Sequence, residues 1–192
     1  MSAVLQQRGS AAASLPGPCP VITSGSLVLR PHRASDADAV AQSLSDFSVA
    51  CMLARVPQPY HREDALDWLQ LHLPDSSPNW TLAITNGDDV HIGVVGLELL
   101  GSDWHLGYWL NRFYWGKGIM TEAVGAAVDR FLRRMPDVEL RSGVFVDNPA
   151  SLRVQQKLGF TITGCADVFA LSRNAMVPHV ETRLRPENFR RS

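Results

Sequence analysis

Two glycines one residue apart, Gly116 and Gly118, precede a helical pattern in the segment Tyr114–Ala123 (YWGKGIMTEA). Glycine permits positive φ and lets a ligand approach the backbone closely. A helix N-terminus offers unpaired N–H groups and a partial positive charge, which suit a phosphate, and the acidic Glu122 complements that dipole. The segment therefore predicts an anion-binding turn. Taken by itself, it is also consistent with a tight turn that leads into a packed helix.

A second motif follows downstream, where Asn148 and Pro149 come after the predicted strand Glu139–Val146. Asn148 can cap a helix, and Pro149 suits the first helical position, where its missing N–H costs nothing. Gly159 suits the C-terminal cap, and Phe160 begins the next strand. A short capped helix between two strands explains these signals. It does not explain why this unit follows the glycine turn.

The two motifs together, Trp115–Ala123 and Asn148–Phe160, resemble the GNAT acetyltransferase superfamily, and within it the ribosomal-protein N-terminal (alanine and serine) acetyltransferases. The resemblance covers about Ser26–Arg185. Leu27–Pro31 resembles the opening strand, and Leu106–Leu110 resembles the strand before the pyrophosphate loop. The resemblance implies an α/β fold with a mixed, mostly antiparallel sheet, flanking helices and a βαβ acetyl-CoA unit. It also implies transfer of an acetyl group from acetyl-CoA, as co-substrate, to a primary amine.

The same resemblance implies how acetyl-CoA is held. Backbone N–H groups from Gly116 to Thr121 bind the pyrophosphate, Lys117 adds a positive charge, and the strand edge Tyr108–Leu110 offers hydrogen bonds to the pantetheine arm. Asn148 either reaches that arm or only caps its helix, and the two roles are compatible. The cofactor-binding set is Tyr108, Trp109, Leu110, Trp115, Gly116, Lys117, Gly118, Ile119, Met120, Thr121, Asn148 and Ser151. Trp115 and Met120 depart from the family pattern, which has Gln or Arg and Gly or Ala there.

Acetyl transfer requires that a protonated amine lose its proton and that the departing thiolate gain one. Gln155 stands where many family members have a tyrosine acid, and an amide cannot release a proton. The hydroxyl of Ser151 is the alternative donor, unless it only packs near the helix start. His105 falls where the superfamily often has its glutamate base, and imidazole accepts a proton near neutral pH, although a plain hairpin histidine fits as well. Glu98 on the neighbouring strand is the second candidate base.

The acceptor is predicted less directly. Its walls are expected in Phe47–Tyr60, at the start of the second helix and in the irregular stretch Ala166–Pro178, where Glu63, Asp64 and Asp167 could meet a cationic amine. The branch resemblance points to a protein N-terminal α-amino group. Acetylation of a polyamine, amino acid or antibiotic is an alternative, and so is a non-catalytic acyl-CoA-binding module. The resemblance also allows a homodimer.

Bulk composition agrees with a single globular domain. The chain has 192 residues, 45% of them hydrophobic, which is enough for one sizeable core. A net charge of −1 gives no field that would attract nucleic acid or a membrane surface, and no apolar run approaches the ~20 residues of a spanning helix. The three cysteines Cys19, Cys51 and Cys165 are widely spaced, which predicts no metal site and a reducing, cytoplasmic compartment.

The chain divides into residues 1–25, expected to be a disordered leader rich in Ala, Ser, Gly and Pro, the domain 26–186, and a tail 187–192. Within the domain, periodicity and turn residues predict alternating elements. Strands are expected at residues 26–30, 80–85, 91–100, 104–110, 139–146, 160–164 and 179–185. Helices are expected at residues 35–47, 61–73 and 118–135, and between Asn148 and Gly159.

Overall fold

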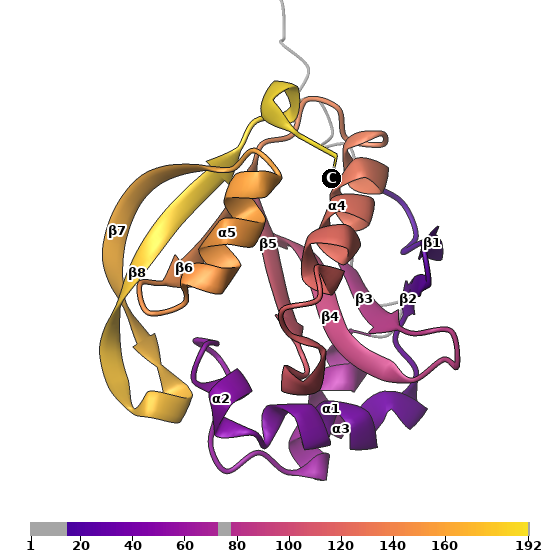
Figure 1. Ribbon diagram of the computed structural model, residues 1–192, viewed down its shortest axis with the longest axis vertical. Helices are drawn as coiled ribbons and strands as arrows, with labels where there is room; N and C mark the ends of the chain where they lie inside the picture. The colour runs from indigo at the N-terminus through magenta and orange to yellow at the C-terminus, as the bar shows by residue number, and fades with distance from the viewer. Residues whose placement is uncertain (1–14, 73–77, 192) are drawn as a thin grey trace, which may run out of the picture.

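The computed structural model describes residues 15–72 and 78–191, which form one eight-stranded sheet flanked by helices (Figure 1). The strand order is β1-β2-β3-β4-β5-β6-β8-β7, and every pair is antiparallel except β5 and β6, which are parallel. The predicted mixed, mostly antiparallel sheet is therefore confirmed. The strands are β1 (Ile22–Ser24), β2 (Leu27–Pro31), β3 (Trp80–Thr85), β4 (His91–Leu100), β5 (Asp103–Leu110), β6 (Leu140–Phe145), β7 (Thr161–Ala170) and β8 (Ala175–Leu184).

The helices lie on both faces of this sheet. They are α1 (Ala37–Leu44), α2 (Phe47–Ala50), α3 (Arg62–Leu71), α4 (Ile119–Leu132) and α5 (Pro149–Lys157), with 3-10 turns at Ala34–Asp36, Arg112–Tyr114, Leu171–Arg173 and Pro186–Asn188. Helices α4 and α5 pack together, and α1 packs with α3 (Figure 1). Among the described residues, no helix is long and apolar enough to cross a bilayer.

Helix α4 provides the main apolar surface on one face of the sheet. Val124, Ala127 and Phe131 recur at helical spacing and are fully buried. The Phe131 ring packs edge-on against Trp80 and Trp104, with ring centroids 5.4 and 4.9 Å apart. Burying a side chain of this size contributes roughly 1.5–3 kcal/mol. This packing holds α4 against the sheet, and the helix begins directly after Gly118, beyond the end of β5.

A second apolar cluster covers the opposite face. It joins Val40 and Leu44 of α1 to Leu69 of α3, and Trp109 of β5 packs against it. Trp109 alternates along β5 with Leu110, which belongs to the first core, and successive strand residues point to opposite faces. The two helix layers are thus separated by the sheet.

Strands β5 and β6 stay paired over a short distance only. Their register joins Trp104 to Leu140 and His105 to Arg141, and the Ser142 hydroxyl then donates to the Leu106 carbonyl at 2.8 Å. Beyond this point the strands diverge (Figure 1). From Gly107 onward, β5 has no partner strand on that side within the described residues. The predicted βαβ unit, β5–α4–β6, is present and is open at this end.

Two predicted elements differ in length from those observed. The helix expected at 35–47 is divided into shorter elements. Ser35 lies inside a 3-10 turn, and α1 ends at Leu44. A separate helix, α2, is capped by Asp46, whose side chain accepts from the Ser48 N–H at 2.9 Å. The stretch Ala166–Pro178, expected to be irregular, is instead a β7–β8 hairpin. Because most of β7 is exposed on both faces, its sequence lacks the alternation that would have predicted a long strand.

The predicted domain limits also need correction. Residues 15–24 of the expected leader pack on the domain: the Trp80 indole N–H donates to the Gly17 carbonyl at 2.9 Å, and Arg134 donates to the Pro16 carbonyl at 2.7 Å. Residues 1–14 lie outside the described residues. The expected tail belongs to the domain through residue 191, because Phe189 packs on the first core and the Arg190 N–H donates to the Leu158 carbonyl.

Candidate active site

A cavity of about 1170 Å³ lies where β5 and β6 diverge, and its lining comes from both faces of the sheet. On the α4 face it is lined by the glycine turn Gly116–Thr121 and by residues along α5 from Pro149 to Lys157. On the α1 face it is lined by residues 52–57 and by the C-terminal end of α3. Two ligands that enter from opposite faces would therefore meet beside β5.

The glycine turn leaves a row of backbone N–H groups unpaired. Gly116 and Gly118 have φ of 73° and 78°, and a Cβ at either position would meet nothing within 4 Å. Backbone conformation, rather than crowding, therefore requires glycine there. Within the described residues, no backbone N–H from Gly116 to Thr121 donates to a protein carbonyl, and no side chain caps α4. Such a row of N–H groups at a helix start is suited to an anion.

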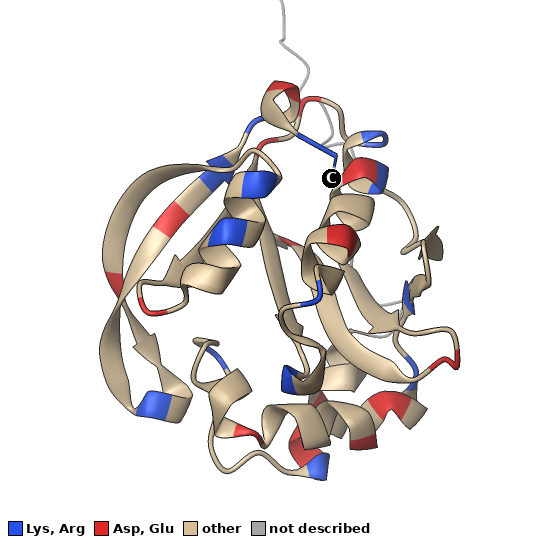
Figure 2. Ribbon diagram, viewed as in Figure 1, with Lys and Arg blue, Asp and Glu red and all other residues tan. Residues whose placement is uncertain are grey.

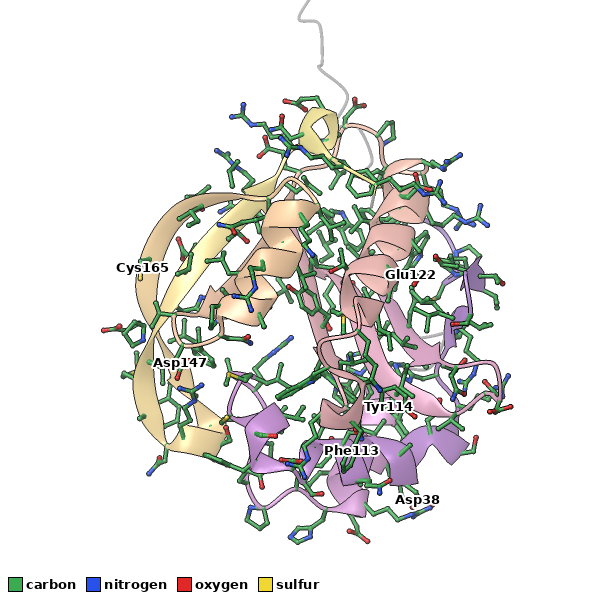
Figure 3. All side chains as sticks on the ribbon, viewed as in Figure 1. Asp38, Phe113, Tyr114, Glu122, Asp147 and Cys165 are labelled. Atoms are coloured by element: carbon green, nitrogen blue, oxygen red, sulfur yellow. The ribbon has the colours of Figure 1, made fainter. Side chains whose placement is uncertain are left out.

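Neighbouring side chains brace this turn. The Trp115 indole N–H donates to the Leu110 carbonyl at 2.7 Å. The Lys117 ammonium donates to the Phe113 carbonyl at 3.0 Å and lies 5.5 Å from the centre of the Tyr114 ring. Figure 3 shows Phe113 and Tyr114 just before α4. Trp115 thus fastens the turn to the end of β5, and Lys117 keeps its charge at the turn.

The α4 side of the cavity carries more positive than negative charge. Lys117, Arg153 and Lys157 line it, and Figure 2 shows basic residues on α5 and on the turn before α4. The nearby Asp147 carboxylate is bound by both Nη atoms of Arg173, at 2.6 and 3.1 Å, and this contact lowers the pKa of Asp147. The remaining charge is suited to phosphate groups.

The free edge of β5 offers alternate backbone groups to the cavity. The Asn111 N–H donates to the Ile92 carbonyl of β4 at 2.8 Å, so odd-numbered residues of β5 face β4 and even-numbered ones face the divergence. Tyr108 therefore presents its N–H and C=O groups there, and Leu110 presents its N–H, because its carbonyl accepts from Trp115. The role of this edge in binding the pantetheine arm stays a prediction. The backbone of Trp109 faces β4 instead, and this residue lines the cavity with its side chain.

Helix α5 brings two hydroxyl groups together at the divergence. The Ser151 hydroxyl donates to the Tyr108 phenol oxygen at 2.8 Å, and the phenol donates to the Ser151 carbonyl at 3.1 Å. Burial raises the pKa of Tyr108 to about 12, against the opposing hydrogen bonds from Ser151 and Gln155. The phenol is thus protonated at neutral pH. Sequence reasoning assigned Tyr108 only a backbone role, because nothing local indicates its contact with α5.

Asn148 and Gln155 hold α5 in place. The Asn148 side-chain oxygen accepts from the Ser151 N–H at 3.1 Å, so the predicted capping role is present. Gln155 is buried, donates to the Ser142 hydroxyl at 2.8 Å and accepts from the Thr182 hydroxyl at 2.6 Å. Gln155 therefore joins α5 to β6 and β8 where many family members place an acid.

Glu98 presents a carboxylate to the cavity on the α1 face. Its Oε2 accepts from Arg55 Nη2 at 3.2 Å, and its Oε1 lies 3.8 Å from His72 Nε2. The contact with His72 lowers the pKa of Glu98, burial opposes that effect, and Arg55 adds to it. Neither His72 nor Arg55 was predicted as a site residue, since no sequence spacing connects them to Glu98.

His105 lies beside this group without reaching the cavity. It is directly opposite Glu98 in the β4–β5 register, so both side chains are on one face, but only Glu98 lines the cavity. Burial lowers the pKa of His105, and the charge of Asp103 opposes that effect. The structure thus places both predicted bases side by side, and of the two only Glu98 lines the cavity.

The acceptor walls agree with the prediction in part. Residues 52–57 line the cavity, as expected, and α3 contributes Asp64 together with residues nearer its C-terminal end. Glu63 and residues 166–178, including Asp167, do not line it. The β7–β8 hairpin acts indirectly: Arg173 donates to the Cys51 carbonyl at 2.5 Å, which holds the wall segment in place. Cys165, on the outer strand β7, lies away from the cavity (Figure 3).

Residues 26–161 match the family model of the acetyltransferase (GNAT) domain. The chain belongs to the GNAT family. Two curated relatives match it over shorter segments. The Bacillus subtilis protein named "Probable N-acetyltransferase YjcK" is 37% identical over 86 residues, which are 43% of this chain and 48% of the relative. The Escherichia coli ribosomal-protein-serine acetyltransferase is 34% identical over 84 residues, which are 41% of this chain and 45% of the relative. The chain thus spans about half the length of these two relatives.

Solved GNAT structures share the fold. An acetyltransferase of Bacillus anthracis has a TM-score of 0.75 at 19% identity, covering 88% of this chain and 99% of its own. The ribosomal-protein-S5-alanine acetyltransferase of Vibrio fischeri has a TM-score of 0.72 at 20% identity, covering 89% and 99%. The spermidine N-acetyltransferase of Vibrio cholerae, solved with CoA and spermine, has a TM-score of 0.71 at 15% identity, covering 85% and 97%. At these identities the likeness shows the fold alone.

Proposed function

We propose that this protein is an acetyl-CoA-dependent N-acetyltransferase whose acceptor is the α-amino group of a protein N-terminus. The observation that carries the proposal is the cavity at the β5–β6 divergence, which has an anion-binding turn on one face and a carboxylate on the other. In the family to which the chain belongs, this arrangement suits acetyl-CoA on the α4 face. The amine then enters from the α1 face.

The chain's own residues fit acetyl-CoA on the α4 face. The N–H groups of Gly116–Thr121 hold the pyrophosphate, and Lys117, Arg153 and Lys157 balance phosphate charge. The free backbone groups of Tyr108 on β5 bind the pantetheine arm, which brings the thioester to the divergence.

Two sets of side chains handle protons during transfer. Glu98 receives the proton of the acceptor ammonium, directly or through one water, so that the amine nitrogen can attack. The new C–N bond forms as the C–S bond breaks. The Ser151 hydroxyl turns from Tyr108, gives its proton to the departing sulfur and regains one from the attacking nitrogen, which loses its second proton as the amide forms. The Tyr108 phenol, which donates to the Ser151 carbonyl, holds the serine in position. Glu98 is preferred over His105 because of its access to the cavity.

The acceptor side suits an α-amino group more than a polyamine. Leu53, Val56 and Trp68 supply apolar surface for a peptide side chain. Among the described residues, three acidic side chains line that side: Glu98 is paired with Arg55 and His72, Asp64 accepts from the His61 N–H at 2.7 Å, and Asp67 lies three residues further along α3. Asp64 and Asp67 would also suit the ammonium groups of a polyamine, so the preference for an α-amino group rests on the apolar wall. The name of the Escherichia coli relative supports a ribosomal-protein acceptor.

CoA release tests this proposal against a panel of acceptors. Peptides that begin with Ala or Ser, each with an Nα-blocked copy that retains an internal lysine, are compared with spermidine and an aminoglycoside. We expect release with the free α-amine and none with the blocked copy. Equal release from both copies, or a preference for spermidine, would overturn the acceptor assignment. Calorimetric binding of acetyl-CoA without release from any acceptor would favour a non-catalytic module, and no binding would overturn the cofactor assignment.

A further inference from the structure

His72 is held at the end of α3 so that one ring nitrogen faces Glu98. Its Nδ1 lies 2.6 Å from the Trp68 carbonyl, and its ring stacks on the Trp68 ring with centroids 4.4 Å apart. A carbonyl oxygen only accepts, so Nδ1 carries the proton. Nε2 is then left to face the Glu98 carboxylate at 3.8 Å, and a carboxylate there favours a second proton. The geometry therefore favours the imidazolium.

Buried rings support this orientation from behind. The Trp68 ring meets His32 edge-on, with centroids 5.0 Å apart, and the His32 side chain is completely buried. The C-terminal end of a helix also favours a cation, and His72 caps the C-terminus of α3. Ring contacts on one side and the carboxylate on the other leave His72 little rotational freedom.

We propose that His72 is a positioning residue that holds one oxygen of Glu98 and leaves the other for the acceptor amine, an inference that rests on the proposed function. Oε1 faces His72, and Oε2 binds Arg55. The Arg55 side chain is 77% exposed, so it exchanges readily with an incoming ammonium. His72 is 17% exposed and is the fixed partner. His72 thus acts through Glu98 and does not need to touch the acceptor.

Several charged groups face this pair. Burial disfavours the charged form of His72, but its contacts with Glu98 and the Trp68 carbonyl outweigh this and raise its pKa, against the charge of Arg55. His32 is coupled to His72 by charge, and His105 is coupled to Glu98 from β5. The pKa of Glu98 is lowered chiefly by His72, so the carboxylate stays ionised until the pH falls below its usual range. Removing the His72 charge should therefore raise the pKa of Glu98.

The first test compares the pH dependence of kcat/KM in the wild type, His72→Gln and His61→Gln, with acetyl-CoA saturating. The glutamine amide of His72→Gln retains a donor without the charge, and His61 is an exposed histidine at the other end of α3 that does not line the cavity. We expect the acid limb of His72→Gln to move to higher pH and kcat to fall by up to about a hundredfold. The His61→Gln profile should match the wild type. A His72→Gln profile that also matches the wild type would overturn the proposal.

The second test needs no turnover, so it separates this inference from the proposed function. NMR titration follows the ring nitrogens of His72 in the free protein and in Glu98→Gln. We expect the pKa of His72 to lie above the ordinary histidine value in the wild type and to fall in the variant. An unchanged His72 titration would overturn the pairing even if the enzyme acetylates peptides. The shift in the variant would support the pairing even if the acceptor assignment failed.

Discussion

The two sides of the cavity present different kinds of chemical group. On the α4 side, the binding groups are mainly backbone N–H groups of one turn, Gly116–Thr121, and the helix α5 that follows soon after in the chain. On the α1 side, the reactive groups are the side chains of Arg55, His72 and Glu98, which come from a loop, a helix end and a strand. The first side depends on backbone conformation, which local sequence determines. The second depends on tertiary packing and on charge.

The difference has an electrostatic consequence. Backbone N–H groups carry fixed partial charges that do not titrate, so anion binding by the turn should vary little with pH apart from the phosphates themselves. The carboxylate on the α1 side does titrate, and His72 and Arg55 set its range. Substitutions on the two sides should therefore separate into effects on acetyl-CoA affinity and effects on the rate of acetyl transfer.

The largest effect is expected from Glu98→Gln, which keeps the shape of the side chain but removes the proton acceptor. We expect kcat to fall by roughly 10²–10⁴-fold, the range for loss of a general base, while the calorimetric Kd for acetyl-CoA stays unchanged. His105→Gln is the matched control on the same sheet face. If His105→Gln lowers kcat more than Glu98→Gln, the base is His105 and the preference derived from cavity access is wrong.

The difference between backbone groups on one side and packed side chains on the other explains how much of each side the sequence predicts. Strands β3 and β4 match their expected limits because periodicity and the turn between them are local signals. The Asn148 cap and the positive φ of Gly118 and Gly159 are equally local. The contact between His72 and Glu98 depends on how α3 packs across β4, which no residue spacing encodes. The order of residues 15–24 depends likewise on distant partners such as Arg134.

The next largest effect is expected from Gly118→Ala, which tests the backbone side. Placing an L-residue at φ 78° costs about 1–2 kcal/mol, so we expect acetyl-CoA to bind roughly tenfold more weakly in calorimetry. The KM for the acceptor should change little. Gly87→Ala is the control, because Gly87 is exposed in the β3–β4 turn, is not held at positive φ, and has free space around it. Equal affinities in both variants would show that the turn does not bind the cofactor.

A smaller effect is expected from the hydroxyl pair at the divergence. Tyr108→Phe and Ser151→Ala each remove the 2.8 Å hydrogen bond between the two side chains. We expect each to lower kcat by roughly tenfold, on the scale of one hydrogen bond, and the double variant to lose less than the product of the two. Steady-state kinetics at saturating acetyl-CoA measures this coupling. Strictly multiplicative losses would mean that the two hydroxyls act independently, which would contradict the proposed support of Ser151 by Tyr108.

The smallest effect is expected at Asn148, where one side chain can serve both the fold and the cofactor. Asn148→Ala removes the oxygen that accepts from the Ser151 N–H, which should cost about 1 kcal/mol in the free energy of unfolding. Asn148→Ser retains a capping oxygen but lacks the amide N–H, so its stability should stay near that of the wild type. If the amide also reaches the pantetheine arm, acetyl-CoA should bind more weakly to both variants. If Asn148 only caps α5, the Ser variant should bind acetyl-CoA as tightly as the wild type. Urea unfolding and calorimetry on the two variants therefore separate the two roles.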